Sequence, residues 1–258
     1  MAEKKKIAIV TGAGSGLGKE FVSLLCKEKD VDEIWAVARN QEKLEKLRTI
    51  CDKQLRVFSV DLTDRMALTE FGEKVQQADV SITYLVNNAG YGKFCSYDDV
   101  TVTDSVNMID LNVSAVVAMG LYCIPKMEKG SHMINIASQS AFQPLPYLNI
   151  YSATKAFVRN YSRALRVELK EKQITVTAVC PGWLKTPFME RADVGAEKTV
   201  RHYMGITTPD NVAKKALKDA KKGKDISVYG IYTKMAHTVA KILPQRMMMK
   251  IWLWQQNM

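Results

Sequence analysis

The chain has 258 residues, of which 47% are apolar and 25% charged, and its formal net charge is +10. A chain of this length and apolar content can bury a sizeable core in one α/β domain, which excludes a disordered protein. Residues 1–6 lack the apolar centre of a signal peptide, and no run of eighteen apolar residues occurs. We therefore expect neither secretion nor a membrane-spanning helix.

The predicted elements begin with a β-branched run at 6–10, which is typical of a strand buried on both faces. The glycine-rich sequence TGAGSGLG follows at 11–18, and apolar residues at helical spacing follow at 19–29. Glycines let the backbone approach a ligand closely, and the unpaired N–H groups of a helix N-terminus bind phosphate. The predicted cofactor contacts in this turn are Gly12, Gly14, Ser15, Gly16, Leu17 and Gly18.

The glycine spacing in this turn, Gly12-x3-Gly16-x-Gly18, departs from the commoner G-x-G-x-x-G pattern of dinucleotide sites. The alternative is an ordinary flexible turn. Because a strand and a helix flank the glycines in the required order, we favour a nucleotide site.

The alternation of strands and helices continues along the chain. Further strands are predicted at 33–38, 55–60, 82–86, 131–136 and 174–179, with long helices at 103–124 and 151–171. Without repeats or linkers, this order predicts a single α/β domain with a doubly wound parallel sheet, a Rossmann-like fold. Ligands in such folds bind beyond the carboxyl ends of the strands. Residues that directly follow predicted strands are Gly12, Arg39, Asp61, Asn88, Ser138 and Pro181.

Arg39 predicts which dinucleotide is bound. Folds that take NAD usually place an acidic residue about 20 residues beyond the glycine turn, where it accepts from the ribose 2′-hydroxyl. Here the second strand ends in Ala38-Arg39-Asn40, without a carboxylate. A guanidinium at this place pairs with a 2′-phosphate, so we favour NADP over NAD; an ordinary surface arginine is the alternative.

Tyr151 and Lys155 lie four residues apart, on one face of the predicted helix at 151–171. A free tyrosine has a pKa near ~10, which is too high for proton exchange at neutral pH. A neighbouring ammonium favours the phenolate and lowers that pKa toward the range of a general acid/base. By itself the pair is common on helix surfaces, so its meaning depends on the other motifs.

Taken in order, these motifs resemble those of the short-chain dehydrogenase/reductase family, over about residues 5–230. The resemblance rests on TGAGSGLG at 11–18, Asp61, NNAG at 87–90, Asn112, Ser138, Tyr151 with Lys155, and Pro181-Gly182 with Thr186. It implies an oxidoreductase that transfers a hydride to or from a nicotinamide cofactor.

The resemblance also implies residue roles. Tyr151 exchanges a proton with the substrate oxygen, Lys155 lowers the pKa of Tyr151 and holds the nicotinamide ribose, and Ser138 hydrogen-bonds the substrate oxygen. Asn112 holds a water that links Lys155 to solvent. The implied cofactor contacts are Asp61 and Leu62 at the adenine, Asn88, Ala89 and Gly90 at the adenine-side ribose, and Gly182 and Thr186 at the nicotinamide end.

The substrate is predicted from apolar residues near the motifs. They are Tyr91, Phe94, Phe142, Leu145, Tyr147, Trp183, Phe188, Met189 and Tyr203. Residues 184–207 are expected to form a mobile lid. An apolar wall suits a hydrophobic ketone or secondary alcohol, although ordinary lid packing explains it equally well. Family members with such pockets favour a hydroxysteroid, with a 3-oxoacyl thioester as the alternative. A different-class alternative is a binding protein that senses the dinucleotide without turnover.

The C-terminal extension, residues 232–258, goes beyond the family pattern. Its methionines and tryptophans supply adaptable apolar surface. We rank a cover over the substrate site and a subunit contact equally, and an interfacial helix on an anionic membrane third. The family's usual assembly implies a homodimer or homotetramer through the helices that carry Asn112 and Tyr151.

Positive charge is concentrated toward the C-terminus, where the residues from Arg191 onward include 13 Lys and Arg against 5 Asp and Glu. A solvated face is the favoured interpretation, ahead of attraction to phosphates, acidic substrates or an anionic membrane. Nucleic-acid binding is not expected, because no aromatic platform or recognised motif accompanies the charge.

Cysteines and histidines give two further expectations. The five cysteines are Cys26, Cys51, Cys95, Cys123 and Cys180. An odd number without a C-x-x-C pair predicts reduced, mostly buried thiols in a cytoplasmic protein. The three histidines, at 132, 202 and 237, match no ligand spacing, so we predict no metal site.

Overall fold

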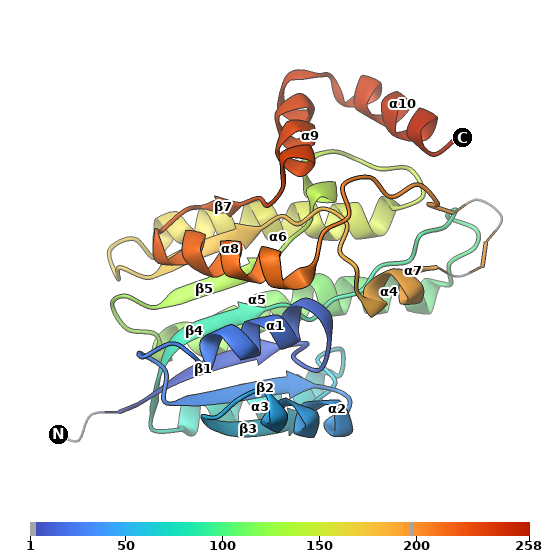
Figure 1. Cartoon of the computed structure of the whole chain (residues 1–258). Helices are drawn as coiled ribbons and strands as arrows, with labels where there is room; N and C mark the ends of the chain where they lie inside the picture. Colours follow the sequence, from blue (N-terminus) through green and yellow to red (C-terminus); the bar gives the residue numbers. More distant parts are fainter. Residues whose placement is uncertain (1–3, 194, 197–198) are drawn as a thin grey trace.

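The computed structural model of the chain, described here for residues 4–193, 195–196 and 199–258, contains one seven-stranded sheet with helices on both faces (Figure 1). The strands run in the order β3-β2-β1-β4-β5-β6-β7, and every pairing is parallel. The order reverses between β1 and β4, so the sheet is doubly wound and the predicted fold class is confirmed. The strands are β1 (Lys5–Thr11), β2 (Glu33–Ala38), β3 (Gln54–Ser59), β4 (Val80–Asn87), β5 (His132–Ile136), β6 (Thr175–Val179) and β7 (Ile226–Ser227).

The helices cover both faces of this sheet. They are α1 (Gly16–Leu25), α2 (Gln41–Glu45), α3 (Arg65–Gln77), α4 (Val102–Ile109), α5 (Ala115–Cys123), α6 (Asn149–Glu168), α7 (Pro187–Ala192), α8 (Pro209–Lys221), α9 (Ile231–Ile242) and α10 (Gln245–Gln255). Shorter turns are η1 (Lys46–Thr49), η2 (Asp110–Ser114), η3 (Ile124–Lys126) and η4 (Gln139–Phe142). Strand β7 was not predicted, because two residues are too short to show a periodic pattern.

The core forms two layers, one on each side of the sheet. Ala8 and Val10 of β1 pack with residues of α1 and α8, whereas Ile7 and Ile9 pack with residues of α3 and α5. Successive side chains of a strand point to opposite faces of the sheet. A run of four fully buried apolar residues therefore requires helices packed on both faces. This burial places the end of β1, and therefore the glycine turn, at the middle of the sheet.

The long helix predicted at 103–124 is interrupted. Residues 110–114 form a π-helical turn between α4 and α5, and Asn112 lies in this turn, fully buried. Turns of this kind are frequent at functional sites. By length and composition alone, the stretch Val102–Lys126 is apolar enough to span a membrane, with a mean hydropathy of 1.6 and 39% of its most apolar window buried. This is weak evidence, because the core helix of a globular domain passes the same test.

Two cysteines contradict the expectation of reduced thiols. Cys26, at the end of α1, and Cys51, after η1, form a disulfide with a Cα–Cα distance of 5.6 Å. The prediction was wrong for this pair because tertiary packing, and not sequence spacing, brings the ends of α1 and η1 together. Cys95, Cys123 and Cys180 are free and buried.

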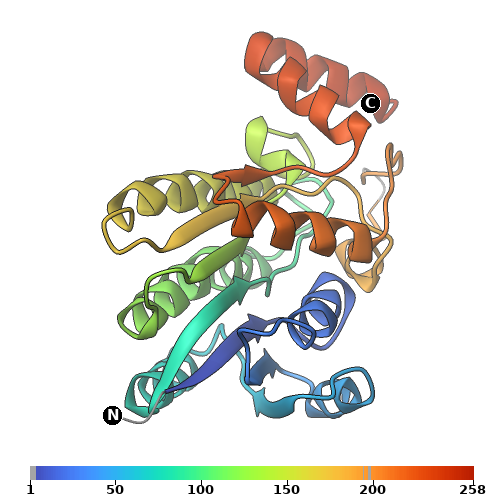
Figure 2. The same cartoon turned by 60° about the vertical axis from the view of Figure 1, so that its left-hand side comes forward.

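The C-terminal extension forms α9 and α10, which lie beyond the β7 edge of the sheet (Figures 1 and 2). Both views show the two helices projecting from the body of the domain, with the C-terminus at the end of α10. Because α9 begins four residues after β7 ends, the extension starts at the carboxyl end of this edge strand.

Candidate active site

A cavity of about 980 Å³ opens beyond the carboxyl ends of the strands. Nearly all residues predicted from the sequence line it. They are Gly12, Gly14, Ser15, Gly16, Leu17, Arg39, Asp61, Leu62, Asn88, Ala89, Gly90, Ser138, Tyr151, Lys155, Gly182 and Thr186. The fold thus gathers seven separate sequence segments into one site, and of the predicted catalytic and cofactor residues only Gly18 and Asn112 do not line it.

The glycine turn has the backbone that an anion site requires. Gly12 and Gly16 have φ values of +65° and +52°, a region that other residues rarely adopt. Gly16 also begins α1, so the first free N–H groups of that helix face the cavity. The phosphates of a dinucleotide fit here, because both the helix N-terminus and the exposed backbone favour an anion.

Gly18 does not line the cavity, and packing explains why a glycine stands at this position, while its predicted contact with the cofactor stays a prediction. A Cβ atom at Gly18 would collide with the carbonyl oxygen of Gly12 and would lie 2.6 Å from the Asn88 amide nitrogen. Glycine is needed here so that α1 can lie close against the turn and β4. Sequence spacing alone does not distinguish such a glycine from one that touches the ligand.

Asn88 fixes the glycine turn from the neighbouring strand β4. Its side-chain Nδ2 donates to the carbonyl oxygens of Thr11 (3.0 Å) and Gly12 (3.2 Å). The Thr11 hydroxyl in turn accepts from the backbone N–H groups of Asn88 and Ala89, both at 3.0 Å. These four bonds hold the ends of β1 and β4 together and leave the backbone at 88–90 to face the cavity.

One end of the cavity carries cations. Arg39 lies 3.7 Å from the Asp61 carboxylate, and its side chain is 70% exposed. Partial burial raises the pKa of Asp61, but hydrogen bonds from Thr63 and the charge of Arg39 outweigh this and hold it below its usual value. Lys43, which the sequence reasoning missed, also lines the cavity, with its Cβ beside Gly14. The sequence signal that could have identified it is a second cation four residues after Arg39.

Tyr151 lies near the start of α6 and is 9% exposed. Burial raises the pKa of Tyr151 to about 12, and a hydrogen bond with Ser138 offsets part of this increase. The expected lowering by Lys155 is therefore wrong for this structure, because desolvation penalises the phenolate more than the neighbouring groups favour it. At neutral pH the hydroxyl is protonated and can donate.

Lys155 lies one helical turn after Tyr151, with its Nζ 5.7 Å from the centre of the tyrosine ring. The predicted proximity of the pair is confirmed. Burial lowers the pKa of Lys155 to about 8, and the Nζ donates to the carbonyl oxygen of Ile136 at 2.8 Å. The ammonium is thus held at the end of β5, and it remains charged at neutral pH.

Asn112 lies behind the cavity wall. Its Nδ2 donates to the Tyr91 carbonyl (2.9 Å) and the Thr154 hydroxyl (3.1 Å), while its Oδ1 accepts from the Tyr91 N–H at 3.0 Å. These bonds use both amide protons and one of the two oxygen lone pairs. Asn112 and Lys155 both border Gly90, where a Cβ would lie 2.8 Å from the Oδ1 and 3.3 Å from the Nζ. A water of the predicted relay can therefore bind Asn112 only at the remaining lone pair of the Oδ1.

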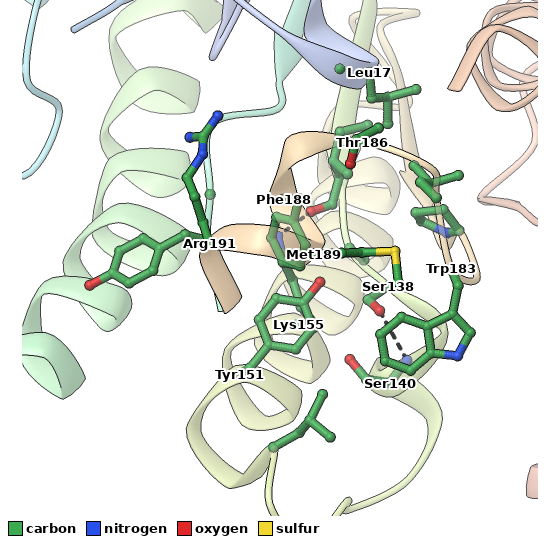
Figure 3. Close-up of a pocket in the computed structure, with 18 of the residues that line it drawn as sticks. Leu17, Ser138, Ser140, Tyr151, Lys155, Trp183, Thr186, Phe188, Met189 and Arg191 are labelled. Carbon is green, nitrogen blue, oxygen red and sulfur yellow. Dashed lines mark hydrogen bonds between the residues drawn. The ribbon is translucent and has the colours of Figure 1, made fainter. Parts of the chain in front are cut away.

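Aromatic side chains surround Tyr151. Phe94 and Phe188 have ring centres 6.0 and 5.7 Å from that of Tyr151, and Trp183 lies 5.6 Å from Phe94. Figure 3 shows the Phe188 ring between Tyr151 and the glycine-turn side of the cavity, marked by Leu17. Of the other predicted wall residues, Tyr91, Leu145 and Met189 line the cavity, whereas Phe142, Tyr147 and Tyr203 do not.

The segment predicted as a lid, 184–207, contains α7; its residues 194, 197 and 198 lie outside the described part of the chain. The described lid residues contact the glycine turn. The Cγ2 of Thr186 lies 3.2 Å from the place of a Cβ on Gly16, and Arg191 donates to the Ser15 hydroxyl at 3.4 Å. Arg191, also labelled in Figure 3, was not predicted as a site residue, since a lid sequence has no fixed spacing to the glycines.

The C-terminal extension supplies the outer wall of the cavity. From α10, Met248 and Trp252 are buried, and the Trp252 indole N–H donates to the Pro146 carbonyl at 3.0 Å. The Gln256 side chain accepts from the N–H groups of Arg201 and His202 and donates to the carbonyl of His202. These bonds tie α10 to the segment after α7. Within the described ranges, no group of three or more His, Cys, Asp or Glu could hold a metal ion.

Comparison with known proteins agrees with this arrangement. Residues 6–196 match the short chain dehydrogenase family. The chain belongs to the short-chain dehydrogenase family. It is an oxidoreductase, and the similarity covers the segments that carry the glycine turn, Ser138, Tyr151 and Lys155.

Individual relatives of this short-chain dehydrogenase are similar over most of their length. An uncharacterized oxidoreductase of Staphylococcus epidermidis is 31% identical over 197 residues, which cover 76% of this chain and 85% of that protein. A short-chain dehydrogenase from Sphingobium yanoikuyae in complex with NADPH has a TM-score of 0.78 at 24% identity, covering 95% of each chain. The closed form of a serine dehydrogenase complexed with NADP+ has a TM-score of 0.68 at 31% identity, covering 81% of this chain and 86% of that one.

A nicotinamide dinucleotide fits the residues of the site. The α1 N-terminus and the positive-φ glycines suit its phosphates, and the cavity continues from Arg39 at one end to Tyr151 and Lys155 at the other. When bound, the nicotinamide supplies the hydride. The protein contributes orientation, exclusion of water and a proton donor.

Proposed function

We propose that the protein is an NADP(H)-dependent oxidoreductase that interconverts a hydrophobic ketone and a secondary alcohol, with a hydroxysteroid as the favoured substrate. One observation carries this proposal: a protonated tyrosine and a charged lysine lie side by side in a cavity that combines a glycine turn and cations at one end with apolar and aromatic side chains around the tyrosine. A 3-oxoacyl thioester is the alternative substrate.

In reduction, Tyr151 donates its hydroxyl proton to the carbonyl oxygen of the substrate as negative charge develops there. A pKa of about 12 keeps this proton in place until the oxygen becomes basic. Ser138 accepts a hydrogen bond from the N–H of Ser140 at 3.1 Å, and its hydroxyl proton, which bonds the Tyr151 oxygen in this structure, turns to the substrate oxygen and stabilises the charge there. The Lys155 ammonium favours the phenolate that remains after transfer.

Preference for NADP over NAD rests on the cations at the adenine end. Arg39 and Lys43 line the cavity there, and the Arg39 fork suits the 2′-phosphate. Asp61 pairs with Arg39 from the side of β3, so it orients the guanidinium. The NADP+ in the serine dehydrogenase structure, at 31% identity, supports this preference.

A hydrophobic substrate is supported by the wall opposite the cofactor residues. This wall contains Phe94, Leu145, Trp183, Met189, Met248 and Trp252. Few charged side chains lie among them, so the site favours a rigid apolar body over a long thioester that carries phosphates. We propose that 184–207 act as a lid and that α10 covers the same site.

We also propose that the chain forms a homodimer or homotetramer. Exposed apolar side chains gather on the helices that carry Asn112 and Tyr151, in support of the assembly that the family implies. They are Val102, Val106, Ile109, Leu121, Phe157 and Val167. Sedimentation analysis of a Leu121→Glu variant tests this assembly, because a buried charge at a subunit contact dissociates the oligomer.

A cytoplasmic location stays a prediction. The three buried free thiols agree with it, whereas the Cys26–Cys51 disulfide is unusual for that compartment. Alkylation of thiols in freshly lysed cells, followed by mass spectrometry, tests the state of that pair.

A spectrophotometric screen tests the proposed function. NADPH and NADH are each combined with steroid ketones, 3-oxoacyl thioesters and simple carbonyls, and oxidation of the cofactor is followed. We expect the highest kcat/KM with NADPH and a steroid ketone. Turnover of thioesters alone would favour the alternative substrate, and tight NADPH binding without any turnover would favour a dinucleotide-sensing protein.

A further inference from the structure

The outer face of α9 carries an exposed apolar stripe, made of Ile231, Met235, Val239 and Ile242. Their side chains are 78%, 63%, 39% and 75% exposed. Successive spacings of four, four and three residues place all of them on one side of the helix. Such a stripe normally faces a core. Here, in the part of the chain that the structure describes, it faces solvent.

A second exposed apolar face lies on α10. Met247 and Trp254 are 48% and 76% exposed, seven residues apart and therefore on one face of that helix. The opposite face of α10 holds Met248 and Trp252 against the cavity. Since α9 and α10 project beyond the sheet (Figures 1 and 2), both exposed faces lie on the part of the molecule farthest from the core.

Positive charge borders this apolar surface. Lys234 and Lys241 of α9 directly precede Met235 and Ile242, and Arg246 and Lys250 lie on α10. All four are exposed, and none forms a salt bridge within the described residues. From residue 226 to the end, the sequence contains no Asp or Glu. The surface therefore combines four cations with bulky apolar side chains.

A second feature beside the stripe also suits an anion. Lys234 and Lys241 line a hollow of about 630 Å³ together with Arg159, whose guanidinium lies over the Phe142 ring. His237 lines the same hollow, and its buried Nε2 has no hydrogen-bond partner among the described residues. The two carboxylates of the hollow, Asp219 and Asp225, already pair with Lys215, Lys224 and Arg163. Among the described residues, the polar groups of the hollow without a partner are thus the Lys234 and Lys241 ammonium groups and one imidazole nitrogen.

We propose that α9 and α10 bind the surface of an anionic lipid membrane. The apolar stripe enters the boundary between headgroups and acyl chains, and the four cations and the hollow contact lipid phosphates. A second copy of the chain is disfavoured as the occupant, because it would bring four cations against four. An anionic bilayer offers both an apolar phase and the opposite charge.

This docking gives the substrate a direct path. Met235 and Val239 belong to the stripe and also line the catalytic cavity, so the membrane-facing side of α9 forms one rim of that cavity. A hydrophobic ketone dissolved in the bilayer therefore enters the site without crossing water. This step rests on the proposed function. Docking itself does not require turnover.

Vesicle flotation of the full-length protein tests the proposal. Vesicles of phosphatidylcholine alone are compared with vesicles containing 30% phosphatidylglycerol, at 0.1 and 0.5 M NaCl. We expect flotation with the anionic vesicles and at least tenfold weaker partitioning to the neutral ones. High salt weakens the binding, since cations near the surface act through screened charge.

Two variants separate the apolar and the electrostatic contributions. Ile242→Ser with Trp254→Ser lowers the partition coefficient at least tenfold, and Lys241→Gln with Lys250→Gln lowers it about 25-fold, about fivefold for each lysine. The matched controls bind as the unmodified protein does. They are Met66→Ser, at an apolar side chain that is 74% exposed on α3, and Lys46→Gln with Lys170→Gln at exposed lysines elsewhere.

Other outcomes overturn the proposal. No flotation, equal binding to neutral and anionic vesicles, or unchanged binding of both paired variants would exclude it. A doubled mass in solution that Ile242→Ser with Trp254→Ser abolishes would assign the surface to a second copy. Binding to anionic vesicles without turnover of any ketone would uphold the docking and refute the proposed substrate, so the two failures are distinguishable.

Discussion

Replacement of Tyr151 by phenylalanine separates catalysis from folding. The change removes one hydroxyl and keeps the ring that packs against Phe94 and Phe188. The lost hydrogen bond with Ser138 costs about 1 kcal/mol of unfolding free energy, and Ser138 keeps its bond from the Ser140 N–H. We therefore expect a decrease in Tm of only about 2–4 °C for a chain of this size.

Turnover responds far more strongly. Removal of a positioned proton donor lowers kcat by about 10²- to 10⁴-fold, which corresponds to about 3–5 kcal/mol of transition-state free energy. Ketone reduction is measured by NADPH absorbance, cofactor affinity by fluorescence titration and stability by thermal unfolding. Tyr97→Phe, at a side chain that is 78% exposed, is the matched control. A kcat within tenfold of the unmodified protein, or a loss of NADPH binding, would refute the role of Tyr151.

Three further predictions concern Lys155, Arg39 and Trp252. Below pH 8 Lys155 is charged in both the folded and unfolded states. Between pH 8 and 10.5, the ordinary pKa of lysine, Lys155 keeps its proton only in the unfolded chain. The free energy of unfolding therefore rises with pH by up to about 3 kcal/mol over this range. Chemical unfolding at several pH values should show this rise in the unmodified protein and not in Lys155→Met. Reduction should slow as pH increases through about 8, a trend that steady-state rates check. Arg39→Asp should shift the NADP/NAD ratio of kcat/KM at least tenfold toward NAD, whereas Arg65→Asp leaves it unchanged. Trp252→Ala should raise KM for the ketone severalfold and leave the Kd for NADPH unaltered; equal weakening of both would contradict its place in the substrate wall.

Local sequence features predicted the elements that carry the site. The β-branched run of β1 and the glycines after it predict a strand, a tight turn and a helix in that order. A strand buried on both faces belongs to a parallel sheet, in which a helix connects it to the next strand. The structure confirms this arrangement and places Tyr151 and Lys155 one helical turn apart. The seventh strand and the π turn around Asn112 escaped prediction, because one is too short for periodicity and the other depends on hydrogen bonds to Tyr91 and Thr154.

Electrostatic environment was the least predictable property. Sequence spacing correctly placed an ammonium near the phenol, yet it predicted the wrong direction for the pKa of Tyr151, since desolvation depends on the rings of Phe94 and Phe188 and on the lid. The same limitation applies to Gly18, whose neighbours are known only once α1 lies against β4.

The sequence by itself determined the order of strands and helices, the glycine turn, and the pairing of Tyr151 with Lys155, because these follow from local periodicity and short-range spacing. Only the tertiary structure decided that Lys43, Arg191 and residues of α10 join the cavity, which cysteines meet, and which faces of α9 and α10 stay in solvent. Burial and proximity between distant segments result from packing of the whole chain, and no local pattern specifies them.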